Sequence, residues 1–192
     1  MSTRGGEKPS KSVVDKQSKK SWLDAALQAL ASGGIDQVRV ESLAKKLGVT
    51  KGSFYWHFKD REQFLDELLN FWAERSTQVV IANPNYPTDS KARVRAVAED
   101  IVRHDLGKLD PHVRSWTQYD KRRARVVAKI DKVRFEFLRD LFLAAGFSMI
   151  GSDLRAQSLY RYVLGEQFIS VRESMSQRLQ RMQAHVDLLL QA

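Results

Sequence analysis

The spacing of apolar residues is the feature that most restricts the fold of this 192-residue chain. From Trp22 to Leu190, apolar side chains recur three and four residues apart, a spacing that puts them on one face of an α-helix. No stretch shows the apolar–polar alternation of a half-buried β-strand. The sequence therefore predicts an all-α fold of about nine helices.

Glycines divide the N-terminal part of this pattern into short helices. The first stripe begins at Trp22 and stops at Gly33 and Gly34, because glycine commonly ends a helix. A second short stripe ends at Gly48, and a third short segment covers residues 51–57. The spacing thus predicts three helices before residue 60, with a sharp turn between the second and the third.

A fourth helix and a proline-rich loop set the expected domain boundaries. Asp60 is placed to cap the fourth helix, with Gln63 three residues on as in a capping box. Residues 83–87 include two of the four prolines and must form a loop, beyond which helices resume. The expected organisation is a disordered basic arm (1–17), a three-helix domain (18–62), and a longer helical domain (63–192) that the fourth helix joins to it.

The composition excludes several classes of protein. The chain has no cysteine, which excludes disulfides, thiolate catalysis and cysteine-ligated zinc. It has no long apolar run and no signal-like N-terminus, so we expect a cytoplasmic protein without a membrane partner. Lys and Arg outnumber Asp and Glu by 32 to 23, which favours a polyanionic partner. A second basic cluster at residues 121–125 is interpreted as a solvated helix face.

Residues 39–62 have the clearest chemical meaning. A short helix, a turn at Gly48 and a second short helix match a helix-turn-helix, whose second helix enters the major groove of DNA. Thr50 is expected to cap that second helix and leave its amides facing a phosphate. Nearby charged and hydroxyl-bearing side chains suit phosphate binding: Lys51, Ser53, Tyr55, Lys59 and Arg61.

Five consecutive aromatic side chains occupy positions 54–58. Five neighbours on a helix cannot all point inward, so some of them must be exposed. Phe54 and Phe58 are four residues apart and are expected in the core. Tyr55, Trp56 and His57 are then left facing outward beside lysines, where exposed rings usually contact a partner.

On these residues, the chain resembles the TetR/AcrR family of transcriptional regulators over about residues 18–70. The resemblance implies a DNA-binding head of three helices and a fourth helix leading into a ligand-binding, dimeric body. It implies that Thr50, Lys51 and Ser53 begin the recognition helix. Tyr55 and His57 would touch phosphates, and Trp56 would occupy the variable base-contacting position. Arg61 keeps the charge of the lysine usual in the family.

Arg39 departs from the family pattern, which has Thr or Ser capping the second helix. Arginine cannot cap a helix N-terminus and is disfavoured there by the helix dipole. Either the helix start frays, or Arg39 reaches a phosphate or a base edge, and we expect the DNA contact. The expected DNA-binding residues are Arg39, Thr50, Lys51, Gly52, Ser53, Tyr55, Trp56, His57, Lys59 and Arg61.

The residues beyond 88 carry a weaker signal. Aromatic side chains at helical spacing are usually plain core, but the resemblance implies an effector pocket in this half of the chain. Trp72 and Trp116 could border one cavity. The candidate ligand-binding residues are Trp72, His104, Trp116, Tyr119, Phe137 and Tyr160, with Phe168 as a further aromatic candidate.

The function expected from these patterns is a repressor that a small-molecule effector releases from a palindromic operator. Because a short recognition helix reads few base pairs, we expect a homodimer built on the last two helices, with Leu154, Leu164, Val171 and Leu179 at the interface. An enzyme is not expected, since no nucleophile–base pair, metal-ligand spacing or cofactor motif is present. A helical protein-interaction adaptor and a regulator without a ligand remain alternatives. The small molecule could also be a corepressor, which would raise the affinity for the operator instead of lowering it.

Overall fold

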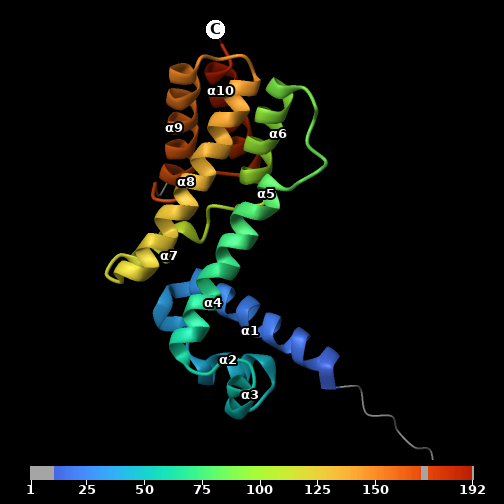
Figure 1. The fold of residues 1–192 in the computed structure, drawn as a ribbon, viewed down its shortest axis with the longest axis vertical. Coiled ribbons are helices and arrows are strands. Elements are labelled where there is room, and N and C mark those ends of the chain that lie inside the picture. Colours follow the sequence, from blue (N-terminus) through green and yellow to red (C-terminus); the bar gives the residue numbers. More distant parts are fainter. Residues whose placement is uncertain (1–10, 170–172, 192) are drawn as a thin grey trace, which may run out of the picture. The chain divides into compact units, whose positions relative to one another are not determined.

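The computed structural model describes the backbone of residues 11–169 and 173–191 (Figure 1). All regular elements in these residues are helical, which confirms the predicted fold class. The chain divides into two compact units, residues 1–71 and 72–192. The predicted arm falls partly outside the description: nothing is described for residues 1–10, whereas residues 11–17 belong to the first helix, which begins at Lys11.

The N-terminal unit consists of four α-helices and one short 3-10 helix. They are α1 (Lys11–Gly33), η1 (Ile35–Gln37), α2 (Val40–Leu47), α3 (Lys51–Tyr55) and α4 (Arg61–Ala73), the last of which runs on into the second unit. The order of short helix, turn and short helix at α2 and α3 is the one that the sequence predicts.

Gly48 forms the turn between α2 and α3. Its backbone adopts the left-handed conformation, with φ 69° and ψ 27°. The amide of Gly48 donates to the Lys45 carbonyl at 3.2 Å, and the amide of Val49 donates to the Ala44 carbonyl at 3.0 Å. This pair of bonds is a Schellman motif, which satisfies the last carbonyls of α2 and reverses the chain.

The cap predicted for α4 is present in a modified form. Asp60 accepts a hydrogen bond from the Gln63 amide at 2.8 Å, as a capping residue should. The Gln63 side chain accepts its return bond from the amide of Lys59, at 2.7 Å, rather than from that of Asp60. Two amides at the start of the helix are therefore satisfied, and the turn after α3 is fixed.

Phe54 lies at the centre of an aromatic cluster that fills the N-terminal unit. Its ring centroid is 5.4 Å from that of Trp22, 5.0 Å from Phe58 and 5.2 Å from Phe64. All four rings are only 1% exposed. Because each ring comes from a different helix or turn, the cluster fixes α1, α3 and α4 relative to one another.

The C-terminal unit is a bundle of longer helices (Figure 1). In it, α4 continues without a break through a π-helical turn (Glu74–Gln78) into α5 (Val79–Ile81). The others are α6 (Ser90–Arg103), α7 (Asp110–Thr117), α8 (Lys121–Ala144), α9 (Met149–Glu166) and α10 (Met175–Leu189). With α4 and α5 taken as one helix, the described residues hold nine α-helices, as predicted.

The core of this unit lies where α8 packs on α9 and where α6 packs on α10 and α8. It is aliphatic for the most part, and Phe142 is a fully buried ring within it. Residues 82–89 form the loop that the prolines predict. Side chains accept capping bonds at the starts of four helices: Asp89, Asp120, Ser148 and Ser174.

The Gly48 turn gives a prediction for stability. Gly48→Ala should lower the free energy of unfolding by about 1–2 kcal/mol, because a Cβ is disfavoured in the left-handed conformation. Gly52→Ala is the matched control: Gly52 lies inside α3, and its added Cβ would meet only the Thr50 hydroxyl, at 3.6 Å. Urea denaturation followed by circular dichroism measures both. Equal losses would contradict the role of the turn.

Candidate functional site

One face of α3 exposes aromatic rings while the opposite face is buried. Tyr55 is 58% exposed and Trp56 79%, whereas Phe54 and Phe58 are each 1% exposed. The predicted division into core and outward-facing rings is therefore confirmed for these four residues. His57 is half-buried, with its ring 6.2 Å from that of Phe58. An exposed Trp beside an exposed Tyr is costly unless a partner covers them.

Basic residues from three elements surround a shallow hollow of about 310 Å³ beside these rings. Its wall includes Arg39 before α2, Lys51 and Tyr55 of α3, and Arg61 at the start of α4. Of the other residues predicted to contact DNA, Thr50, Gly52, Trp56 and Lys59 are exposed, and Ser53 and His57 are half-buried. The fold thus gathers side chains from positions 39–61 onto one small domain.

Lys51 is paired with Glu41, a contact that the sequence analysis missed. The Lys51 ammonium lies 2.5 Å from a Glu41 carboxylate oxygen, and both side chains are more than half exposed. This hydrogen bond raises the pKa of Lys51 and lowers that of Glu41. A phosphate that binds Lys51 would share the ammonium with Glu41, whose negative charge weakens that binding. The two residues lie on different helices, so no helical spacing reveals the pair.

Arg39 and Thr50 occupy helix N-caps without capping through their side chains. Arg39 is extended, makes no side-chain cap bond, and donates from Nε to the Asp36 carbonyl at 2.8 Å. This holds the guanidinium at the surface, next to the hollow. The expected side-chain cap at Thr50 is wrong, because its hydroxyl makes no cap bond. The Ser53 amide instead donates to the Thr50 backbone carbonyl, at 3.0 Å.

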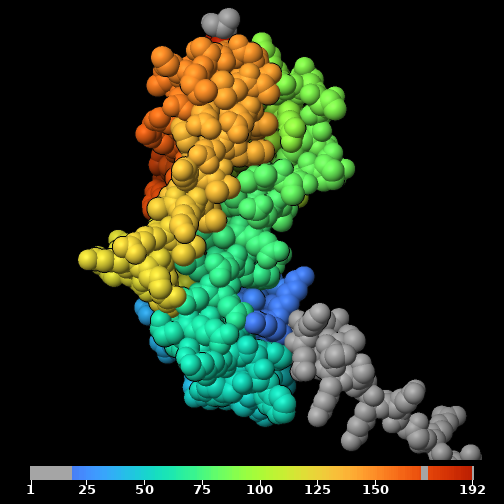
Figure 2. All heavy atoms as spheres, in the orientation of Figure 1, coloured from blue at the N-terminus to red at the C-terminus, as the bar shows by residue number. Residues whose placement is uncertain are grey.

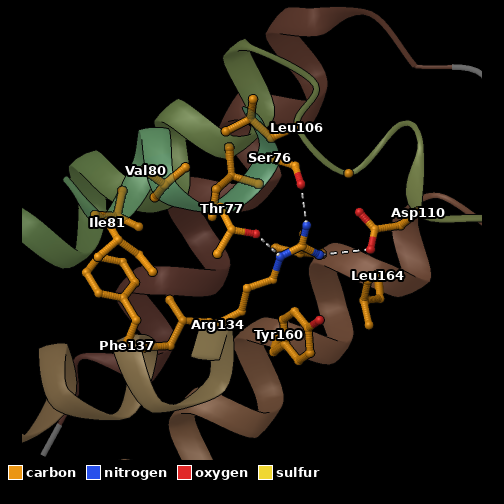
Figure 3. Close-up of a pocket in the computed structure, with 15 residues that line it drawn as sticks. Ser76, Thr77, Val80, Ile81, Leu106, Asp110, Arg134, Phe137, Tyr160 and Leu164 are labelled. Atoms are coloured by element: carbon orange, nitrogen blue, oxygen red, sulfur yellow. Dashed lines mark hydrogen bonds and ion pairs between the residues drawn. The ribbon is translucent and has the colours of Figure 1, made fainter. Parts of the chain in front are cut away.

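A second hollow lies inside the C-terminal unit (Figure 3), with free space of about 50 Å³. Phe137 and Tyr160, two of the predicted ligand-binding residues, line it. Most of its wall is aliphatic, and its few polar side chains gather at one end. The main wall residues are Val80, Ile81, Val97, Ile101, Leu106, Leu138, Val163 and Leu164, with Ser76, Thr77, Asp110 and Arg134 as the polar ones.

Arg134 of α8 organises that polar end (Figure 3). Its Nε donates to the Thr77 hydroxyl at 2.8 Å and its Nη2 donates to the Ser76 hydroxyl at 2.7 Å. Its Nη1 donates to Oδ1 of Asp110 at 2.8 Å. Ser76 and Thr77 belong to the π-helical turn, a kind of irregularity that is common at functional sites. One guanidinium therefore ties α8 to that turn and to the start of α7.

Trp72 lies against Arg134 rather than in the wall of the hollow. The guanidinium carbon of Arg134 is 5.0 Å from the Trp72 ring centroid, and Trp72 is 1% exposed. This distance allows a cation–π contact in a buried setting. Trp72 therefore contacts Arg134, which lines the hollow, but Trp72 itself does not line the hollow.

A second ion pair extends the network. Arg114 of α7 donates from both terminal nitrogens to Asp131 of α8, at 2.9 and 2.6 Å. Tyr160 donates to the same Asp131 carboxylate at 2.6 Å. Burial would raise the pKa of Asp131, but the bonds from Arg114 and Tyr160 outweigh it and hold this pKa below its usual value. Burial also raises the pKa of Tyr160 to about 12.

The remaining predicted ligand-binding residues lie away from this hollow. Tyr119 is 90% exposed, and His104 is exposed and paired with Asp100 at 3.1 Å. Trp116 is half-buried, with the Arg123 guanidinium 5.8 Å from its ring centroid. Phe168 is exposed and borders a different surface hollow. Neither Trp72 nor Trp116 lines the hollow beside Arg134.

The described residues contain no group of three His, Asp or Glu side chains placed to hold a metal ion. Within the same part of the chain, no helix combines the length and apolarity needed to cross a membrane.

Comparison with known proteins identifies the N-terminal unit. Residues 23–68 match the sequence profile described as "Bacterial regulatory proteins, tetR family". This stretch includes three of the four rings of the aromatic cluster, the Gly48 turn and the exposed face of α3. Over this stretch the chain is similar to the TetR/AcrR family. The family resemblance seen in the sequence is thereby confirmed.

Curated relatives of the TetR/AcrR family match this chain mainly near its N-terminus. The HTH-type transcriptional regulator AcrR of Shigella flexneri is 34% identical over 84 residues, which are 44% of this chain and 38% of the relative. The class D tetracycline repressor protein of Escherichia coli is 42% identical over 50 residues, 26% of this chain and 23% of the relative. The matched region therefore spans well under half the length of these relatives.

A solved structure resembles the chain over nearly its whole length. It is a protein from Saccharomonospora viridis, described as a transcriptional regulator and crystallised in complex with choline. The TM-score is 0.77 at 15% identity, and the alignment covers 90% of this chain and 96% of the other. At this identity the likeness extends the shared fold to the C-terminal unit and does not transfer a ligand.

The Arg134 network gives a second prediction for stability. Arg134→Ala should lower the free energy of unfolding by about 3–5 kcal/mol, because it leaves the Asp110 carboxylate buried without its closest partner. Arg139→Ala on the same helix is the control: its pair with Asp140 is partly exposed and should cost at most about 0.5 kcal/mol. Chemical denaturation compares the two. A loss below 1 kcal/mol for Arg134→Ala would show that the pair is not structural.

Proposed function

We propose that this chain is a sequence-specific DNA-binding regulator of transcription, with α3 as its recognition helix. The observation that carries the proposal is the exposure of Tyr55 and Trp56 beside Phe54, whose buried ring packs α3 against Trp22 of α1. Basic side chains of Arg39, Lys51 and Arg61 surround the same face. This combination of rings and cations suits a duplex, since cations bind phosphates and a ring can meet base edges.

The proposed roles differ between residues of the surface. Lys51, Lys59 and Arg61 bind phosphates and supply affinity for any duplex. Trp56, the most exposed ring, faces the base edges and supplies sequence preference. The hydroxyls of Thr50, Ser53 and Tyr55 donate to phosphates near the start of α3. Arg39 reaches the backbone or a base edge from the start of α2.

We further propose that the protein acts as a homodimer on a palindromic operator. A five-residue recognition helix reads few base pairs, so two copies are needed for a long site. The exposed side chains of Met149, Ile150 and Leu154 leave an apolar patch on α9, whose atoms lie in the orange part of Figure 2. Of the other residues expected at the interface, Leu164 and Leu179 are half-buried, and Val171 lies outside the described residues.

The proposed regulator is a repressor, and a small molecule in the hollow of the C-terminal unit lowers its affinity for DNA. Arg134 supports this coupling, because it borders the hollow and bonds the π-helical turn of the helix that begins as α4. Such coupling is typically worth about 1–3 kcal/mol and requires a ligand that prefers the non-binding conformation. The choline of the similar structure is a property of that protein and is not assigned to this one.

The test of the proposed function is selection of a preferred duplex from a random library, followed by fluorescence anisotropy. The proposal expects an enriched palindrome that binds at least a hundredfold more tightly than a scrambled duplex of equal length. Selection without enrichment, and equal affinity for all duplexes, would favour a protein-interaction adaptor instead.

Single substitutions on α3 test the division of roles. Lys51→Ala should weaken binding to every duplex and reduce the salt dependence by about one unit of slope. Trp56→Ala should change the ranking of duplexes while leaving the slope nearly constant. Glu41→Gln should have the opposite effect to Lys51→Ala. It removes the carboxylate that competes with phosphates for Lys51, so binding to all duplexes should become tighter. If Glu41→Gln weakened binding, Lys51 would not be a phosphate ligand.

The apolar patch on α9 predicts how dimerisation can be broken. Ile150→Glu combined with Leu154→Glu should yield monomers, because two carboxylates would be desolvated at the interface. Both side chains are more than 60% exposed in the single chain, so the monomer should keep its fold. Light scattering and circular dichroism measure mass and folding, with Lys91→Glu on α6 as a surface control. A wild-type monomer at micromolar concentration would contradict the dimer itself.

A further inference from the structure

The hollow of the C-terminal unit contains a buried carboxylate oxygen that lacks a partner. Asp110, which lines the hollow, is 0% exposed. Its Oδ1 accepts from Arg134 at 2.8 Å and faces Arg114 at 3.4 Å. Its Oδ2 is buried and has no hydrogen-bond partner among the described residues. A charged acceptor in this position is strongly disfavoured unless a donor reaches it.

The charges around Asp110 restrict the donor to a neutral group. The network holds two guanidiniums, Arg114 and Arg134, and two carboxylates, Asp110 and Asp131, so its charges balance. A cationic head group would add a buried positive charge beside both guanidiniums. An anionic one would meet the two carboxylates. Because an uncompensated buried charge is costly, a neutral hydroxyl or amide fits best.

The remaining wall indicates an apolar body for the same molecule. Val80, Val97, Leu138 and Val163 are buried side chains of this wall. The free space of about 50 Å³ is small beside the ~150 Å³ cavity that holds one benzene. A ligand must therefore displace wall side chains, and Ile81, Leu106 and Leu164 are wall residues that are only half-buried (Figure 3).

We propose that the hollow binds an aliphatic molecule whose neutral head group donates a hydrogen bond to Oδ2 of Asp110. Its regulatory meaning rests on the proposed function, since the hollow is the effector site proposed there. The head group shares its carboxylate with Arg134, which also holds Ser76 and Thr77 of the π-helical turn. The ligand therefore binds next to Arg134, which links the hollow to the π-helical turn that continues from α4.

The test measures binding of matched six-carbon probes to the full-length protein by calorimetry in the absence of DNA. The probes are 1-hexanol, dipropyl ether, hexanoate and hexylammonium. The expected result is that 1-hexanol binds at least tenfold more tightly than the ether, which lacks the donor, and than either charged probe. No binding by any probe would overturn the proposal and leave a water molecule as the partner of Oδ2. Equal binding of alcohol and ether would overturn it as well, as would preference for a charged probe.

Three variants locate the site. Asp110→Asn should abolish the preference of alcohol over ether, because its amide replaces one carboxylate oxygen with a donor. Tyr160→Phe is the control, since Tyr160 lines the same hollow but donates to Asp131, and it should keep the preference. Leu164→Trp fills the hollow and should prevent binding of 1-hexanol. Circular dichroism checks the folding of each variant.

Unchanged binding of 1-hexanol in folded Leu164→Trp would place the site elsewhere and contradict the proposal. Loss of the alcohol preference in Tyr160→Phe would show that Asp131, and not Asp110, accepts the hydrogen bond of the head group. Because these measurements use no DNA, they succeed or fail independently of operator binding. A protein that binds 1-hexanol but no duplex would refute the proposed function and leave this inference intact.

Discussion

The packing of Phe54 is the contact on which the N-terminal unit depends. A helix of five residues is far too short to be stable alone, since isolated helices need about 12–15 residues. The backbone of α3 is therefore held by tertiary contacts, and Phe54, its buried residue, packs against Trp22, Phe58 and Phe64. Because successive side chains on a helix point in different directions, burying Phe54 and Phe58 forces Tyr55 and Trp56 into solvent. The exposed surface is thus a consequence of the core.

The C-terminal unit uses a different kind of constraint. Its core is aliphatic, and it contains a buried polar network centred on Arg134 and Asp110. Such a network adds little net stability compared with apolar residues of the same shape, but removing one partner is costly. It also fixes one arrangement of α7, α8 and the π-helical turn, because each hydrogen bond requires a defined geometry. A hollow beside it is therefore well placed to sense a ligand.

Much of the fold could be predicted because it depends on local patterns. Helical spacing gives the all-α class, and the left-handed Gly48 and the cap at Asp60 mark where short helices end and begin. Helix geometry also predicts that Phe54 is buried and that Trp56 is exposed. Contacts between distant positions were not predictable in the same way. Lys51 and Glu41 meet across two helices, and Arg134 bonds residues more than fifty positions away.

The proposed ligand site shows even more clearly that contacts between distant positions are not predictable from sequence. Trp72 and Trp116 stand out in the sequence as large rings, yet one lies against Arg134 and the other near Arg123. The aliphatic wall residues that line the hollow resemble any other core residues. Asp110 follows ordinary loop residues, and nothing in its neighbourhood indicates that it is fully buried. Only the packing of α5, α6, α8 and α9 brings these side chains together.

The most direct test of the central claim is amide hydrogen exchange, measured by mass spectrometry, with and without a selected duplex. The claim is that the surface built on Phe54 is where the protein binds DNA. The account predicts slower exchange on DNA binding in peptides covering residues 39–61, while peptides covering α8 keep their rates. Unchanged exchange at residues 39–61, together with protection of the basic first half of α8, would contradict it.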